Sequence, residues 1–211
     1  MKKIIALILV LTCLFSLFSC GDREYDEAVV KEEAKTLIEA SVLLNEVLWG
    51  KGIAYSEDKN TSNGVYYEAV FAAHYQMGFK TLSELKSMIQ KTFSSDYCQH
   101  IFKTVMSSNA DENYMTRYYQ KYSSADGTTP EAIMVNSEWM PLLVDEVTYY
   151  TDTIEVIGSK KQLIYVTVNA SVKREGVGTQ ATVLTIALIE EKEGFRLDSP
   201  TYLSYDTTKQ K

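Results

Sequence analysis

The amino-acid sequence predicts an α+β fold, in which N-terminal helices pack on a C-terminal antiparallel β-meander. A hydrophobic stripe at spacings of three and four, followed by two helix-capping motifs, marks helices between positions 26 and 106. From position 146 onward, hydrophobic and polar residues alternate, which is typical of strands with one buried face. The chain has 211 residues and shows no internal repeat or linker, so we expect a single domain.

The first predicted helix begins at about residue 26. Asp26 and Glu27 suit its first turn, because negative charge is favourable at a helix N-terminus. The apolar stripe that follows consists of Val30, Ala34, Leu37, Ser41, Leu44 and Leu48. Gly50 stands where a C-terminal glycine cap is expected, which gives a helix of about six turns.

Two shorter helices are predicted from capping signals. The polar residues 51–64 predict a loop, and 65–71 predict a short strand. Thr81-Leu82-Ser83-Glu84 has the T-x-x-E form of a capping box, which predicts a helix from there to about Thr92. Ser94-Ser95-Asp96 indicates a second cap, followed by a helix over 97–106.

The second half of the chain is predicted to be mainly strands. Residues 107–130 are polar, and within them 114–122 are compatible with either a helix or a strand. A short strand is expected over 132–135, and four longer strands over 147–156, 163–173, 179–190 and 195–200. The breaks between these four strands lie at Gly158-Ser159, at 175–178 and at Glu193-Gly194, and are short enough for hairpins.

Composition excludes several classes of function. The chain carries 28 acidic and 21 basic side chains without a basic tract, so nucleic-acid binding is not expected. Of its three cysteines, Cys13 and Cys20 lie near the N-terminus and Cys98 stands alone, so neither a disulfide scaffold nor a cysteine-based metal site is expected. No cofactor or metal motif is present in the sequence.

The N-terminus resembles a bacterial lipoprotein signal peptide. Two lysines precede the apolar run Ile4–Phe18, and Leu17-Phe18-Ser19-Cys20 resembles a lipobox. The resemblance implies that 1–19 are removed and that Cys20 carries the lipid, which places the protein on the extracytoplasmic face of the cell membrane. A short tether (20–25), the domain (26–202) and a polar tail (203–211) would follow. A cleaved signal without lipid is the alternative, since the run is short for a retained membrane helix.

The order of helices followed by a meander resembles NTF2-like and cystatin-like α+β domains. The ending 193–202, with a turn, an aromatic residue and an alternating strand, is similar to the last strand of such extracytoplasmic domains. The segment Thr81–Phe102 is also similar to the helical part of secreted inhibitors of cell-wall DL-endopeptidases. Neither resemblance assigns a functional residue to this chain.

Few residues are candidates for catalysis. Ser83 and Lys86 match the S-x-x-K of serine acyl-transferases, but the capping box explains the same residues and the partner motifs are missing. Cys98 and His100 are two positions apart on a predicted helix and point in different directions, which leaves His74 as the alternative partner of the thiol. Paired carboxylates could support glycosidase chemistry, but an acidic chain offers many such pairs.

The leading hypothesis is therefore a binding domain without catalytic activity. Aromatic residues are expected to line an open mouth, where they would contact a cell-wall component or an envelope protein. The candidates are Trp49, Tyr66, Tyr67, Tyr118, Tyr119 and Trp139. A cell-wall hydrolase inhibitor is one form of this hypothesis, and an envelope hydrolase that uses carboxylates or Ser83 and Lys86 is the alternative.

Replacing Cys20 with serine tests the anchor. We expect Cys20→Ser to release the protein or to leave an uncleaved precursor, because the hydroxyl cannot take the thioether-linked lipid. The measurement is cell fractionation with fatty-acid labelling, and Cys13→Ser serves as the control. A Cys20→Ser protein that is still processed, labelled and membrane-bound would contradict the lipobox.

Overall fold

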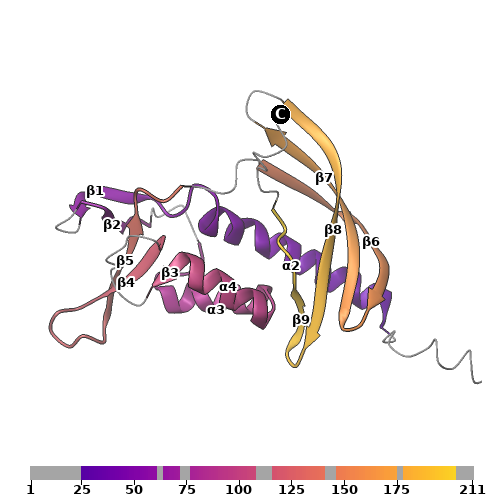
Figure 1. Cartoon of the computed structure of the whole chain (residues 1–211), viewed down its shortest axis with the longest axis horizontal. Coiled ribbons are helices and arrows are strands. Elements are labelled where there is room, and N and C mark those ends of the chain that lie inside the picture. Colours follow the sequence, from indigo (N-terminus) through magenta and orange to yellow (C-terminus); the bar gives the residue numbers. More distant parts are fainter. Residues whose placement is uncertain are drawn as a thin grey trace, which may run out of the picture.

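The computed structural model describes residues 25–60, 64–71, 77–107, 116–140, 146–174 and 178–202. Within them, three helices and two β-sheets form an α+β fold, which confirms the predicted class (Figure 1). One sheet has four strands in the order β6-β7-β8-β9, and the other has five in the order β1-β2-β5-β4-β3. Helix α2 lies between the sheets and packs on the four-stranded one through β6 and β9.

Helix α2 spans Glu27–Leu48, as the hydrophobic stripe predicts. Its N-cap is Asp26, whose carboxylate accepts a hydrogen bond from the N–H of Ala28 at 2.9 Å. The whole predicted stripe is buried: Val30, Ala34, Leu37, Ser41, Leu44 and Leu48. The stripe therefore holds the helix against the sheets.

The C-terminus of α2 is closed by two residues from a distant part of the chain. The Arg117 guanidinium donates through Nη1 to the Leu48 carbonyl at 3.0 Å and through Nη2 to the Gly50 carbonyl at 2.8 Å. The Tyr118 hydroxyl donates to the Val47 carbonyl at 2.6 Å. These donors satisfy carbonyls near the helix end, several of which have no partner inside a helix, and the cation lies at the negative end of the helix dipole.

Gly50 directly follows Trp49, the C-cap of α2, as predicted, but its backbone is not left-handed. Gly52, not Gly50, has the left-handed backbone, with φ of 82°, and its N–H donates to the Glu46 carbonyl at 3.0 Å. A Cβ on Gly52 would lie 2.0 Å from Arg117 Nη2, so glycine is needed there for the guanidinium to approach. The turn is shaped by Arg117, which local sequence does not reveal.

The two capping signals for the shorter helices are confirmed. Helix α3 spans Leu82–Thr92, and α4 spans Ser95–Val105. The Thr81 hydroxyl accepts from the N–H of Glu84 at 3.2 Å, and the Glu84 carboxylate accepts from the N–H of Thr81 at 3.0 Å. Ser94 caps α4 through its hydroxyl.

The C-terminal meander is also confirmed. Its strands are β6 (Glu146–Lys160), β7 (Leu163–Arg174), β8 (Gly178–Glu191) and β9 (Gly194–Leu197). All neighbours pair antiparallel. The predicted dry face of β7 is buried throughout: Ile164, Val166, Val168, Ala170 and Val172.

Strand β6 is longer than predicted, because Gly158 does not end it. The register with β7 shifts between Val156 and Gly158, where the glycine has φ of 143°. The chain turns instead between Lys160 and Leu163, which are paired with each other. Glycine inside a strand is also typical of a bulge, and Gly158 lies at such an irregularity of β6 instead of in the predicted turn.

The five-stranded sheet was not predicted as a unit. Its strands are β1 (Tyr55–Asn60), β2 (Tyr66–Ala69), β3 (Met106–Ser107), β4 (Tyr118–Tyr122) and β5 (Pro130–Asn136). Strand β3 pairs parallel with β4, and the other neighbours pair antiparallel. The loop predicted over 51–64 is therefore wrong where β1 forms, and 118–122 are a strand. The short strands predicted over 65–71 and 132–135 are confirmed.

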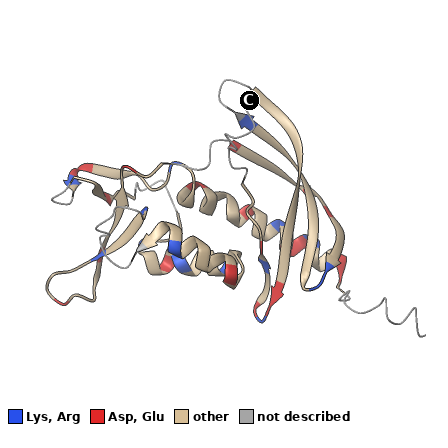
Figure 2. Cartoon of the chain, viewed as in Figure 1, with Lys and Arg blue, Asp and Glu red and all other residues tan. Residues whose placement is uncertain are grey.

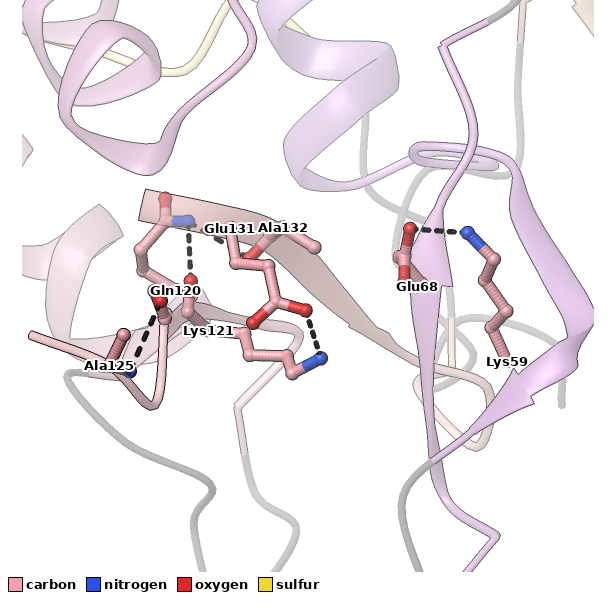
Figure 3. A network of polar contacts seen from close by, with 8 residues as sticks. Lys59, Glu68, Gln120, Lys121, Ala125, Glu131 and Ala132 are labelled. Carbon is pink, nitrogen blue, oxygen red and sulfur yellow. Dashed lines mark hydrogen bonds and ion pairs between the residues drawn. The ribbon is translucent and has the colours of Figure 1, made fainter. Parts of the chain in front are cut away.

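Gln120 ties this sheet to helix α3. Its amide nitrogen donates to the carbonyls of Lys121 at 3.1 Å and Ala132 at 2.9 Å (Figure 3). Its oxygen accepts from the N–H of Leu82 at 2.9 Å. Two exposed ion pairs join neighbouring strands, namely Lys59–Glu68 at 3.0 Å and Lys121–Glu131 at 2.6 Å. Exposed pairs of this kind contribute little to stability.

One continuous cluster of buried hydrophobic residues connects the helices with both sheets. It includes Leu48 of α2, Ile133 of β5 and Val166 of β7. None of the helices that the structure describes is long and apolar enough to cross a membrane. The predictions for residues 1–24, including Cys20, and for His74 and the tail 203–211 lie outside the described residues.

Replacing Arg117 tests the closure of α2. Arg117→Met leaves the carbonyls of Leu48 and Gly50 buried without their donors, so we expect the free energy of unfolding to fall by at least about 2 kcal/mol. Urea unfolding of the purified protein measures it. Lys121→Met, on the adjoining strand and in an exposed ion pair, should change it by less than about 1 kcal/mol. Equal effects of the two substitutions would contradict the role of Arg117.

Candidate functional site

A groove of about 1120 Å³ lies between helices α3 and α4 and the hairpin that joins β8 to β9. Its size reaches that of typical ligand sites, which occupy roughly 300–1,000 Å³. The polar side chains along it are Gln90, Ser95, Gln99, Glu190, Glu191, Lys192, Glu193 and Arg196. Phe93 and Phe102 add apolar surface. The groove therefore offers many hydrogen-bonding groups and little net charge.

The two walls of the groove are bonded to each other. The Glu191 carboxylate on the hairpin accepts hydrogen bonds from the N–H of Ser95 at 2.8 Å and from the Ser95 hydroxyl at 3.2 Å. The N–H of Ser94 donates to the Leu197 carbonyl at 2.9 Å, and the Ser94 hydroxyl donates to Asp198 at 2.5 Å. A carboxylate at a helix N-terminus is also favourable electrostatically. These contacts hold the groove open in a fixed shape.

Arg196 is the buried charged residue of the groove, with an exposed fraction of only 9%. Its Nε donates to the Gln90 carbonyl at 3.0 Å, and its Nη1 donates to the Phe195 carbonyl at 2.7 Å. Nη2 lies 3.7 Å from the carboxylate of Glu193, which is 87% exposed. The guanidinium therefore retains donor capacity toward the groove.

Cys98 lines the groove but is not activated as a nucleophile. The thiol lies within hydrogen-bonding distance of the Phe93 carbonyl at 3.4 Å, and burial raises its pKa to about 11. His100 is exposed on the same helix and stacks on Tyr97, with ring centroids 6.3 Å apart. Cys98 and His100 are thus not paired, as their spacing predicts.

The structure does not gather the six predicted aromatic residues around a shared mouth. Trp49, Tyr66, Tyr118 and Tyr119 are buried, with exposed fractions of 7% or less, and Tyr67 and Trp139 are partly buried. None of the six lines the groove or the three smaller cavities, of about 320, 260 and 180 Å³. The expectation of a common aromatic mouth is corrected accordingly.

The reason is the second sheet. Tyr66 of β2 and Tyr119 of β4 pack edge to face across it, with ring centroids 4.9 Å apart. Tyr67 contacts Tyr55 of β1 at 5.1 Å, and Trp49 contacts the C-terminal Tyr202 at 5.8 Å. The rings thus serve as core and packing residues in different places.

Ser83 and Lys86 do line one cavity, of about 260 Å³, together with Gln120 and Tyr122. No hydrogen bond joins the two side chains in the part of the chain that the structure describes. Lys86 Nζ lies over the Phe102 ring, 5.7 Å from its centroid. Lys86 is thus directed at Phe102 in this structure.

Sequence reasoning missed the groove residues that matter most, Glu191 and Arg196. The sequence pattern places Glu191 at the end of a predicted hairpin and Arg196 inside a predicted strand. No local signal indicated the role of Arg196, because its burial beside Leu197 is visible only in the structure. A buried arginine needs several acceptors, and here these come from Gln90 of α3, from Phe195 and from Glu193.

Acidic and basic side chains are interspersed over the described elements (Figure 2). Among the described residues, no three His, Cys, Asp or Glu side chains cluster so that they could hold a metal ion. No protein-family model, curated protein or solved structure matches the chain. The candidate site therefore rests on its geometry and chemistry.

The reactivity of Cys98 provides a test of this geometry. In a form that begins at residue 24, where Cys98 is the only cysteine of the sequence, we expect the native thiol to react with Ellman's reagent about 100-fold more slowly than in urea. Burial favours the protonated thiol, so its stabilising effect is present below pH 9 and is lost as the pH rises toward 11. Equal rates in native and unfolded protein would contradict the burial.

Proposed function

We propose that this protein is a lipid-anchored, extracytoplasmic binding domain without catalytic activity. In this proposal the groove between α3, α4 and the β8–β9 hairpin receives an extended segment of a cell-envelope protein. The observation that carries it is the groove itself. Amides, a hydroxyl and charges of both signs line it, and its walls are bonded together. Backbone amides of an extended segment would find partners along such a surface.

The lipobox resemblance supports the location. Cys20 would precede Asp26, the N-cap of α2, by a short tether, so the domain would lie close to the lipid. Helix α2 has 22 residues and is about 33 Å long, with its C-terminal end near the five-stranded sheet. The domain would then extend away from the membrane along α2.

We also propose that α2 and the meander form an NTF2-like or cystatin-like unit. The support is the antiparallel order β6-β7-β8-β9 with one long helix packed on its apolar face. The five-stranded sheet would be an addition to that unit. It carries the residues that close α2.

The absence of catalysis is supported by the state of the candidate groups. The Cys98 thiol is protonated at neutral pH, and Ser83 has no hydrogen bond to Lys86. An envelope hydrolase would need one of these groups, or a pair of carboxylates, to be activated. Turnover of a cell-wall substrate by the purified protein would overturn this part of the proposal.

Inhibition of a cell-wall hydrolase is a second candidate function. The segment Thr81–Phe102, which resembles such inhibitors, supplies one wall of the groove through Gln90, Ser95 and Gln99. The partner would then be the hydrolase, and its activity would fall on binding.

A bulky substitution in the groove tests the proposed site. Gln99→Trp should reduce capture of the envelope partner in a quantitative pull-down at least about tenfold, because the indole fills space that the partner needs. Lys103→Trp, exposed on the next turn of α4 and outside the groove lining, is the matched control and should bind normally. Full capture by Gln99→Trp, with unfolding curves unchanged, would show that the groove is not the site.

A further inference from the structure

A separate cavity of about 180 Å³ lies between the second half of α2 and the start of β6. Its walls combine apolar side chains, Val42 and Val147, with the rings of Tyr149 and Tyr202. Val42 is 46% exposed, so the cavity opens to solvent beside it. Trp49 packs against Tyr202 and supports that ring from behind. The volume equals that of about six water molecules, which suits a small organic molecule.

Asn45, which is only 5% exposed, is the buried polar residue of α2 in this cavity. A chain of hydrogen bonds fixes how its amide is turned. Asn45 Nδ2 donates to Thr201 Oγ1 at 2.7 Å. Thr201 Oγ1 lies 2.7 Å from Ser41 Oγ, and the Ser41 hydroxyl donates to the Ile38 carbonyl at 2.7 Å. The Ile38 carbonyl can only accept, so the Ser41 hydroxyl donates to it. The Thr201 hydroxyl must then donate to Ser41 and accept from Asn45.

The direction of this chain leaves one acceptor without a partner. Asn45 must present its NH₂ group to Thr201, so its Oδ1 is the atom that remains, and Oδ1 is buried with no hydrogen-bond partner in the described residues. A buried acceptor in this state destabilises the folded protein, because its hydration is lost and not replaced. A ligand at this site would therefore need to donate a hydrogen bond.

The Tyr149 hydroxyl is the second unpartnered group. It is buried, and among the described residues no hydrogen bond with acceptable distance and angle reaches it, although Thr201 is near enough to act on its pKa in the lowering direction. Burial dominates and raises the pKa of Tyr149 to about 12, so the hydroxyl stays neutral. A neutral hydroxyl can accept from a donor on a ligand.

The charged residues around the cavity determine which ligand charge is favoured. Glu46 and Glu146 both line it, and no lysine or arginine among the residues that the structure describes does. Glu46 accepts from the N–H of Lys51 at 3.0 Å, and Glu146 forms an exposed ion pair with Lys173 at 3.5 Å. An anion would meet two carboxylates and the negative faces of two rings, whereas a cation would be attracted by all four.

From these contacts we infer that the cavity between α2 and β6 binds a small organic ammonium compound. The ammonium group donates to Asn45 Oδ1 and to the Tyr149 hydroxyl, and the carbon skeleton packs between Tyr149, Tyr202 and the two valines. The site is distinct from the groove, so this inference does not depend on the function proposed for it.

Three probes of one shape test the inference on the full purified chain: benzylamine, benzyl alcohol and benzoate. Titration followed by amide chemical shifts should show benzylamine binding at least tenfold more tightly than benzyl alcohol, with no binding of benzoate. Affinity for the amine should fall as the pH rises through its own pKa. Shift changes should centre on α2 near Val42 and on the start of β6.

Glu146→Gln gives a variant that is expected to fold, because Glu146 is exposed. It should weaken benzylamine about two- to fivefold and leave benzyl alcohol unchanged. Glu131→Gln, an exposed carboxylate on the other sheet, should change neither affinity. Equal binding of amine and alcohol, preference for benzoate, no effect of Glu146→Gln, or no binding of any probe would each overturn the inference.

Discussion

The buried guanidinium of Arg117 is the interaction on which the arrangement of the two sheets depends. It lies just before β4, yet its hydrogen bonds end on Leu48 and Gly50, which close helix α2. The last turn of α2 contains no basic residue of its own, so the positive charge that favours a helix C-terminus comes from the other sheet. Gly52 adapts to this arrangement, because any side chain there would collide with Arg117. Burial lowers the pKa of the guanidinium, but arginine remains charged.

A second polar cluster holds the other side of α2. Ser41 and Asn45 bond to Thr201, which follows β9, and thereby attach the end of the meander to the helix. Helix α2 is therefore bound by polar contacts to Arg117, which precedes β4 of one sheet, and to Thr201, which follows β9 of the other. Hydrophobic burial is non-directional, whereas these hydrogen bonds specify one orientation of the helix. The shapes of the groove and of the smaller cavity both depend on these contacts, since β9 contributes to the groove and α2 to the cavity.

The elements that could be predicted are those whose signals are local. The stripe of α2, the capping box at Thr81 and the alternation in β7 each lie within one segment, and each is confirmed. Strand β1 could not be predicted, because its sequence Tyr55–Asn60 is polar and becomes a strand only by pairing with β2. The aromatic residues were misplaced for the same reason, since the sheet that buries Tyr66 and Tyr119 is built from non-local pairs. The contacts of Arg117 and Arg196 reach across 67 and 106 residues, which no local pattern reveals.

The two sites differ in how they affect the stability of the folded protein, and this difference bears on function. In the groove, Glu191, Ser95 and Arg196 already have partners, so a ligand would meet a preorganised surface and lose little conformational entropy on binding. In the smaller cavity, Asn45 Oδ1 and the Tyr149 hydroxyl are buried without partners, although a valine or a phenylalanine would fill similar space without that cost. Unsatisfied groups that persist beside an opening are typical of sites where local stability has been exchanged for binding. Since the Ser41–Thr201 chain of hydrogen bonds sets the direction of the Asn45 amide, the same contacts that attach the meander to α2 also present its free acceptor.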